Sequence, residues 1–175
     1  CSYGNGYRLT GNPKYKDVMI EGAHSLATRY NPHIGLIRSW DFNKQKWQYP
    51  VIIDNMMNLE FLMWAGRVTG DNAFTQMAIS HADKTMANHF RPDYSCYHVV
   101  SYDTITAQPH IKQTHQGYAD ESAWARGQAW ALYGYTMMYR EAKKQAYLEQ
   151  ANHIAQFLMN HPNTVSYTHL TLPTN

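Results

Sequence analysis

The chain has 175 residues, and 44% of them are hydrophobic, which fits one domain with enough apolar residues to build a core. Its formal net charge of +2 gives no reason to expect nucleic acid or an anionic membrane as a partner. No segment approaches the roughly 18 uninterrupted apolar residues of a membrane-spanning helix. The histidines and cysteines show no spacing typical of zinc, so the sequence predicts no metal site.

Helix signals dominate the chain. Asn12 followed by Pro13 predicts a helix start, because Asn caps free amide groups and Pro suits the first helical position. The residues that follow carry their apolar side chains on one stripe, which predicts an amphipathic helix. Residues 72–90, which Asp71 would cap, and residues 145–160 show the same one-sided pattern.

Two further segments are apolar on all sides, which predicts helices that are buried in the protein. The first begins near Asp54 and ends at Gly70. The second follows Ser122 or Asp120, either of which could cap its start. A buried helix that begins with polar residues must direct them at something polar, such as a cavity that holds a ligand.

The predicted helices alternate between amphipathic and all-apolar, and the chain contains an internal echo. Residues 8–15 (RLTGNPKY) resemble residues 67–74 (RVTGDNAF), which predicts helical hairpins repeated at a period of roughly sixty to seventy residues. Such hairpins would form a toroid with an inner ring of buried helices, and an irregular helical bundle is the alternative. In this prediction the first amphipathic helix has no inner partner. Residues 97–102 have β character, and residues 104–106 could return as a hairpin.

The end of the chain, residues 165–175 (VSYTHLTLPTN), changes character abruptly and resembles a translated sequencing adaptor. We therefore divide the chain into a helical domain, residues 1–164, and a non-native tail that is left out of the fold prediction. An ordinary polar tail is the alternative. We expect sequence upstream of Cys1 to hold any export signal, so the chain does not decide between periplasm and cytoplasm.

Asp54 is the first candidate for chemistry. The apolar residues Val51, Ile52 and Ile53 precede it and an apolar helix follows. Burial would therefore raise its pKa, while the helix N-terminus would lower it. A carboxyl group held between these two effects could act as a general acid/base. A simple helix cap is the alternative.

Arg126 and Trp130 are four residues apart and therefore lie on one face of the predicted helix. An Arg guanidinium matches a carboxylate with two parallel hydrogen bonds, and a Trp ring offers a platform for a sugar, so together they would recognise an acidic sugar. An internal ion pair of Arg126 is the alternative. His98 and Gln116 lie in the loops before this helix, and Trp40 is either another sugar platform or a loop aromatic.

Three segments, taken together and in this order, resemble the unsaturated glucuronyl hydrolases of glycoside hydrolase family 88. They are residues 54–60 (DNMMNLE), residues 97–99 (YHV) and residues 116–130, in which QGY is followed by WARGQAW. Residues 2–11 (SYGNGYRLTG) also resemble the family. The resemblance implies an all-α fold, in which this chain forms about half of an (α/α)6 six-hairpin toroid.

In that family, an Asp protonates C4 of the C4=C5 double bond of an unsaturated uronic acid and helps water to add at C5. The resulting hemiketal opens and releases the rest of an oligosaccharide that a polysaccharide lyase has produced. Asp54 matches the catalytic acid/base. The residues that match the surroundings of the unsaturated sugar are His98, Gln116, Arg126, Trp130 and Trp40.

The resemblance implies no metal or organic cofactor, an unsaturated uronic-acid oligosaccharide as the partner, and neither nucleic acid nor membrane. It also implies a second Asp just before the position of Cys1. Because half a toroid would leave apolar faces open, we expect the isolated chain to be inactive and to aggregate or stay molten. The alternatives are the unsaturated rhamnogalacturonyl hydrolases, which share the fold and the chemistry, and a non-catalytic α/α-repeat carbohydrate-binding module.

Overall fold

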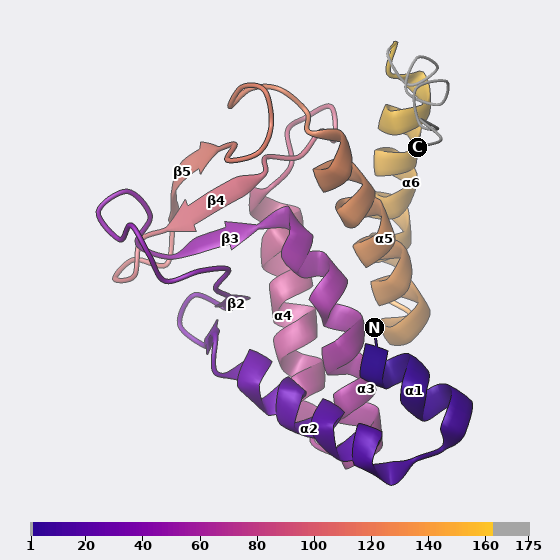
Figure 1. Ribbon diagram of the computed structural model, residues 1–175. Helices are drawn as coiled ribbons and strands as arrows, with labels where there is room; N and C mark the ends of the chain where they lie inside the picture. Colours follow the sequence, from indigo (N-terminus) through magenta and orange to yellow (C-terminus); the bar gives the residue numbers. More distant parts are fainter. Residues whose placement is uncertain (1, 163–175) are drawn as a thin grey trace, which may run out of the picture.

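The computed structural model describes residues 2–162, so the predicted tail at 165–175 lies outside the described residues. Within residues 2–162 each odd-numbered helix packs against the helix that follows it, which makes three helical hairpins (Figure 1). The predicted repeat of helical hairpins is therefore confirmed. The helices are α1 (Ser2–Thr10), α2 (Pro13–Ala27), α3 (Leu59–Thr69), α4 (Asn72–Asn88), α5 (Ala125–Ala142) and α6 (Gln145–Asn160).

The internal echo of the sequence corresponds to the same turn in the first two hairpins. Gly11 and Gly70 have φ angles of +66° and +75°, and each donates its amide to the carbonyl four residues earlier. Asn12 and Asp71 then cap the following helices by accepting a hydrogen bond from the amide two residues on, at 3.0 and 2.9 Å. Glycine has no Cβ and takes the left-handed conformation without strain, so the repeated motif specifies the turn twice.

The prediction that the first amphipathic helix lacks an inner partner is wrong, because α1 packs against α2. The sequence pattern misses α1 since Gly4 and Gly6 weaken its helical signal. Gly6 allows the two helices to approach closely. A Cβ at this position would lie only 3.0 Å from the ring of Tyr15.

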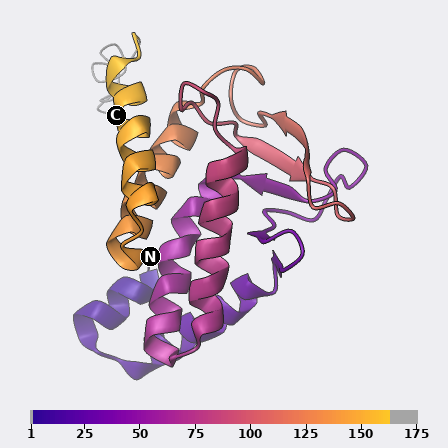
Figure 2. The ribbon, with the colours of Figure 1, turned by 180° about the vertical axis from the view of Figure 1, so that it is seen from behind.

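Two small antiparallel sheets lie together on one side of the helices (Figures 1 and 2). Within the stretch 97–102 predicted to have β character, Val99–Tyr102 forms a strand, but residues 104–106 form a turn and the return strand comes later. The turn forms there because Asp103 Oδ1 accepts hydrogen bonds from the amides of Ile105 and Thr106. The first sheet pairs β1 (Tyr30–Asn31) with β2 (Leu36–Ile37), and the second has the order β3 (Pro50–Ile52), β4 (Val99–Tyr102), β5 (Pro109–Gln113).

Helix α5 packs closely against η1, the 3-10 helix Ile53–Asn58 that joins β3 to α3. Two glycines, seven residues apart and therefore on the same face of α5, allow this approach. A Cβ at Gly127 would lie 3.0 Å from Cγ2 of Ile53, and a Cβ at Gly134 would lie 2.5 Å from the Cβ of Met56. The contact sets the start of α5 beside the start of η1, where Asp54 lies.

The prediction that the second apolar helix is buried on all sides is wrong. Within the described residues, α5 exposes Arg126, Ala129, Tyr133 and Arg140, which lie along one stripe. Glu60 of α3 reaches this stripe, and its carboxylate accepts hydrogen bonds from Tyr133 Oη and Arg140 Nη2. The composition overstates burial because Ala and Tyr count as apolar on exposed faces too. Among residues 2–162, no helix is long and apolar enough to span a membrane.

Candidate active site

The sheet places Asp54 beside His98. β3 and β4 pair in a register that sets Ile52 opposite Val99, and just beyond this pair the amide of Ile53 donates to the carbonyl of His98 at 3.0 Å. The side chains that follow meet, with Nε2 of His98 3.7 Å from Oδ2 of Asp54. The His98 side chain is 1% exposed and that of Asp54 is 13% exposed.

Asp54 is not the N-cap of a helix, so the capping role given as its alternative is not observed. It lies in the first turn of η1, whose N-cap is Ile52 and which has no side-chain capping bond. Burial raises the pKa of the Asp54 carboxyl, and this outweighs a hydrogen bond from its own backbone and the positive charge of Arg126. A carboxyl group that keeps its proton more firmly is suited to act as a general acid.

Two backbone amides fix the tautomer of His98. The amides of His115 and Gln116 donate to its Nδ1 at 3.0 and 3.1 Å. A ring nitrogen that accepts hydrogen bonds carries no proton, so the proton of the neutral ring is on Nε2, on the side of Asp54. Burial, followed by the nearby charges of His115 and Arg126, lowers the pKa of His98 to about 4. The ring is therefore neutral at pH 7 and forms no ion pair with Asp54.

The two facing atoms, His98 Nε2 and Asp54 Oδ2, are both buried. Within the described residues neither atom has a hydrogen-bond partner. Buried polar groups in proteins are nearly always hydrogen-bonded. Two buried polar atoms that face each other without hydrogen-bond partners therefore indicate a place where a ligand supplies those hydrogen bonds.

Arg126 is held from two sides at the start of α5. Its Nη2 donates to Oε1 of Gln116, and its guanidinium lies 4.5 Å from the ring centroid of Trp124. Trp124 in turn packs on His98, with 4.4 Å between the ring centroids. Among residues 2–162 Arg126 forms no ion pair with a carboxylate, so the alternative of an internal ion pair is not observed.

The predicted start of this helix at Ser122 or Asp120 is wrong, since α5 begins at Ala125. The Ser122 hydroxyl donates to the carbonyl of Ala119 at 2.7 Å, and Oδ1 of Asp120 accepts from the amide of Thr114 at 2.8 Å. These side chains bond to the backbone of the loop and not to the helix. Such local bonds compete with helix formation, which delays the start of α5.

Trp124 is a site residue that the sequence does not reveal. In a helix beginning at Ser122, Trp124 and Arg126 would be two positions apart and would point in different directions. In the structure Trp124 is the N-cap of α5, with an extended backbone, so its ring can lie under the guanidinium. No spacing rule could have indicated this contact.

Trp130 lies one turn after Arg126 on α5, as predicted, and is half-buried. Its ring contacts that of Tyr133 edge-on, with 6.2 Å between the centroids. Because the Tyr133 hydroxyl is bonded to Glu60, this pair of rings connects Trp130 to α3. Trp130 therefore belongs to the partly exposed stripe of α5.

Trp40 belongs to an aromatic cluster that adjoins the candidate site. Its ring stacks on Phe42 at 5.5 Å and contacts Trp47 at 5.2 Å and His115 at 5.8 Å between centroids. His115 lies 6.5 Å from His98 between ring centroids. One face of the Trp40 ring is thus already covered by Phe42, which limits the surface that it could offer to a sugar.

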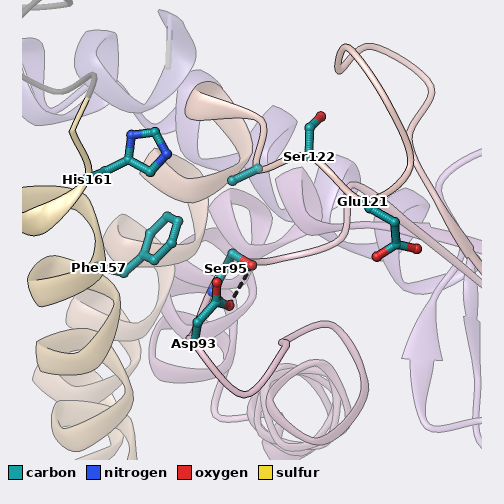
Figure 3. Close-up of a pocket in the computed structure, with 7 residues that line it drawn as sticks. Asp93, Ser95, Glu121, Ser122, Phe157 and His161 are labelled. Carbon is teal, nitrogen blue, oxygen red and sulfur yellow. Dashed lines mark hydrogen bonds between the residues drawn. The ribbon is translucent and has the colours of Figure 1, made fainter.

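Two surface hollows lie apart from the Asp54–His98 pair. The hollow in Figure 3, of about 440 Å³, is lined by Asp93, Ser95, Glu121, Ser122, Ala123, Phe157 and His161. Another, of about 370 Å³, is lined by Asn31, Arg38, Lys44, Gln48, Tyr49 and Thr104. Neither is lined by a predicted site residue. Among residues 2–162, no group of three or more His, Cys, Asp and Glu side chains is placed to hold a metal ion.

Comparisons with known proteins identify the family of the chain. Residues 1–171 match the model of Glycosyl Hydrolase Family 88. The chain belongs to this family. The family 88 chain also matches solved structures of unsaturated glucuronyl hydrolases, and its helical hairpins correspond to part of their α/α toroid. The fold class predicted from the sequence is confirmed.

Three relatives show the extent of the similarity. The chain is 54% identical over 164 residues to the unsaturated glucuronyl hydrolase of Formosa agariphila, covering 93% of this chain and 41% of that protein. It is 34% identical over 154 residues to the unsaturated chondroitin disaccharide hydrolase of Streptococcus pyogenes serotype M1, covering 88% and 39%. The crystal structure of an unsaturated glucuronyl hydrolase specific for heparin matches with a TM-score of 0.90 and 55% identity, covering 93% and 43%. This chain therefore spans about two fifths of the length of its relatives.

Proposed function

We propose that the protein formed by this chain is an unsaturated glucuronyl hydrolase that hydrates the C4=C5 vinyl ether of an unsaturated uronic acid. The acid stands at the non-reducing end of an oligosaccharide left by a polysaccharide lyase. Asp54 acts as the general acid/base. It donates a proton to C4, water adds at C5, and the proton that this water loses returns to Asp54. The hemiketal at C5 then opens and releases the remaining sugar.

The observation that carries this proposal is that Asp54 Oδ2 and His98 Nε2 face each other at 3.7 Å, are both buried, and have no hydrogen-bond partner among residues 2–162. Burial raises the pKa of the carboxyl, which favours the protonated form that the first step needs. The Nε2–H of His98 is a donor that can bond to the carboxylate left after the proton has moved. A non-catalytic binding module does not need a buried carboxyl group with a raised pKa.

The other predicted residues would bind the sugar. Arg126 supports recognition of the uronate carboxylate, because its guanidinium is exposed, unpaired with any carboxylate among residues 2–162, and held flat on Trp124. Gln116 would hold Arg126 in place through its Oε1. Trp130 and Trp40 would offer ring surface to the sugars.

The experiment uses a chimera in which residues 1–164 replace the stretch that they match in the Formosa agariphila relative, because this chain spans 41% of that protein. The chimera is given unsaturated disaccharides from chondroitin, heparin and rhamnogalacturonan. Hydration removes the C4=C5 double bond, so the ultraviolet absorbance of the unsaturated uronate falls. In D2O, one deuteron should appear at C4 of the product.

The outcomes separate the candidate functions. Loss of absorbance with the glucuronyl disaccharides, together with deuteration at C4, supports the proposed hydrolase. Turnover of the rhamnogalacturonan disaccharide alone would assign the related rhamnogalacturonyl activity. Binding without turnover of any disaccharide would support a non-catalytic module and reject the proposal. One relative is named for chondroitin and another for heparin, so the assay must include disaccharides from both polysaccharides.

A further inference from the structure

Arg91 joins the segment that leads to His98 to the loop of residues 114–120. Its side chain is 12% exposed, and its guanidinium lies 3.7 Å from the ring centroid of Tyr97, the residue before His98. Its Nη2 donates to the carbonyl of Asp120 at 2.7 Å. The Arg91 side chain therefore contacts both the segment that leads to His98 and the loop of residues 114–120.

The position of Arg91 is fixed by its neighbours. Its Nη1 donates to Oγ of Ser95 at 3.2 Å, and this hydroxyl donates to Asp93 at 2.7 Å, the hydrogen bond drawn in Figure 3. Glu121, also drawn in Figure 3, lies 3.5 Å from Nε of Arg91, and its side chain is 80% exposed. Exposed ion pairs contribute little to stability, so the two hydrogen bonds that the Arg91 guanidinium donates to Ser95 and Asp120 are the stronger constraint.

The side chain of Asp120 joins the two ends of the same loop. Its Oδ1 accepts a hydrogen bond from the amide of Thr114 at 2.8 Å, which brings the two ends of the loop together. Between these ends lie His115 and Gln116, whose amides donate to Nδ1 of His98. The geometry of those two amides thus depends on the closure that Asp120 makes and on the contact of Arg91 with Asp120.

We propose that Arg91 and Asp120 are positioning residues that hold the loop of residues 114–120 so that its amides keep His98 with Nε2–H directed at Asp54. The inference rests on the proposed function for its chemical purpose, although the arrangement itself needs no substrate. Without the closure the two amides move away from Nδ1, and the neutral ring divides between its two tautomers. When Nδ1 carries the proton, Nε2 presents a lone pair to the carboxylate of Asp54 in place of a donor.

The test reads the tautomer of His98 directly. The chimera is labelled with 15N histidine, and the ring nitrogens of His98 are assigned by comparison with a His98→Gln sample. We expect a single tautomer with unprotonated Nδ1 in the unsubstituted chimera and a mixture in Asp120→Ala. Asp120→Asn should restore the single tautomer, because its side-chain oxygen can still accept from Thr114. The matched control is Glu121→Gln, in which Arg91 keeps both hydrogen bonds and the tautomer should not change.

Kinetics of the same variants give a second readout. In Asp120→Ala, kcat should fall roughly 10- to 100-fold, as expected for a misplaced catalytic group, while KM changes less. Asp120→Asn should recover most of this loss. A folded Asp120→Ala variant with the unaltered tautomer overturns the proposal.

Arg91→Lys covers the case in which Asp120→Ala does not fold. Lysine keeps the charge but lacks the fork that reaches Asp120, so a mixture of His98 tautomers is again expected. Unchanged His98 resonances in Arg91→Lys would overturn the proposal. A mixture of tautomers in the variants of a chimera that consumes no unsaturated disaccharide would leave the positioning role standing and reject the proposed function.

Discussion

His98 presents Nε2 to Oδ2 of Asp54 across 3.7 Å, and within residues 2–162 neither buried atom has a hydrogen-bond partner. The pairing of β3 with β4 creates this contact, because it brings together two residues that are 44 positions apart in the chain. The neutral tautomer of His98 makes the contact one between a donor and an acceptor. The first two predictions concern this pair.

Replacing the carboxyl of Asp54 should abolish turnover without loss of stability. In the chimera we expect Asp54→Asn to lower kcat about 10²- to 10⁴-fold, the usual contribution of a general acid/base. The melting temperature should stay the same or rise, because burial disfavours the charged carboxylate of Asp54. Asp71→Asn is the matched control, since Asn also caps α4. A kcat in Asp54→Asn close to that of the unsubstituted chimera would remove Asp54 from the mechanism.

The activity should have an acid limb near pH 4. Below this pH His98, whose pKa is lowered to about 4, takes up a second proton on Nδ1 and loses the bonds from the two loop amides. Activity should also fall as the pH rises through the raised pKa of Asp54, because the general acid loses its proton. A pH profile of kcat/KM measures both limbs. Over the pH range in which the chimera stays folded, the acid limb should vanish in His98→Gln, and an acid limb that persists there would belong to another group.

Arg126→Lys should weaken substrate binding more than it slows the reaction. Lysine keeps the positive charge but cannot bond a carboxylate with two parallel N–H groups, nor lie flat on Trp124. We expect KM for the unsaturated disaccharide to rise roughly tenfold, equivalent to about 1.4 kcal/mol, with a smaller change in kcat. Steady-state kinetics of the chimera check this. Arg67→Lys is the control, because Arg67 pairs with Glu141 on α5. Equal KM values in both variants would argue against carboxylate recognition by Arg126.

Gly134→Ala should destabilise the fold, although alanine favours helices. Its Cβ would lie 2.5 Å from the Cβ of Met56, an atom that is part of the rigid core and cannot swing aside. Overpacking of this kind typically costs about 1–3 kcal/mol, more than the gain of roughly 1 kcal/mol from helix propensity. Denaturant unfolding measures the difference. Thr136→Ala, on an exposed site of the same helix, should leave stability nearly unchanged.

Two fully buried histidines should make the fold sensitive to mild acid. His81 accepts a hydrogen bond from the amide of Ile37, and burial lowers its pKa to about 3. His89 lies against the carbonyl of Val51, and burial lowers its pKa to about 4. Because the unfolded chain binds these protons first, stability should fall as the pH drops from about 6.5 toward 4.

The size of this loss of stability follows from the lowered pKa values of the buried histidines. Each buried histidine should cost on the order of 3 kcal/mol of unfolding free energy between neutral pH and pH 4. Urea unfolding of the chimera across this range measures the slope, and His89→Gln should reduce the histidine contribution by roughly a third, because His98, whose pKa is also lowered to about 4, contributes as well. His110→Gln, at an exposed site, is the control. A slope that is the same in His89→Gln and in the unsubstituted protein would contradict this account.

Local sequence signals were sufficient for the second and third helical hairpins, but not for α1 of the first. The Thr-Gly-Asx turns at Gly11 and Gly70 need only the conformational freedom of glycine and the capping oxygen of the next residue, so their structure can be read from the chain. The stripe on α6 likewise needs only the helical period. Asp54 and Arg126 were predicted from their position and side-chain chemistry, whereas His98 and Gln116 were weak candidates until the family resemblance was added. Contacts that join His98 to Asp54, Gln116 to His98 and Arg126 to Gln116 bring the four together.

Other features depend on contacts that no local pattern contains. Trp124 lies between His98 and Arg126 only because the loop before α5 uses Asp120 and Ser122 for its own backbone bonds and delays the helix. The raised pKa of Asp54 depends on how deeply η1 is buried.

The sequence by itself therefore determined the second and third hairpins, the turns at Gly11 and Gly70, and which residue types could bind an acidic sugar, because these follow from short-range patterns and side-chain chemistry. Only the tertiary structure decided the tautomer of His98, the balance between burial and charge at Asp54, and the link from Arg91 to the loop of residues 114–120. Those properties arise from atoms that are distant in the chain and meet only when the β3–β4 register and the α5–η1 contact are formed.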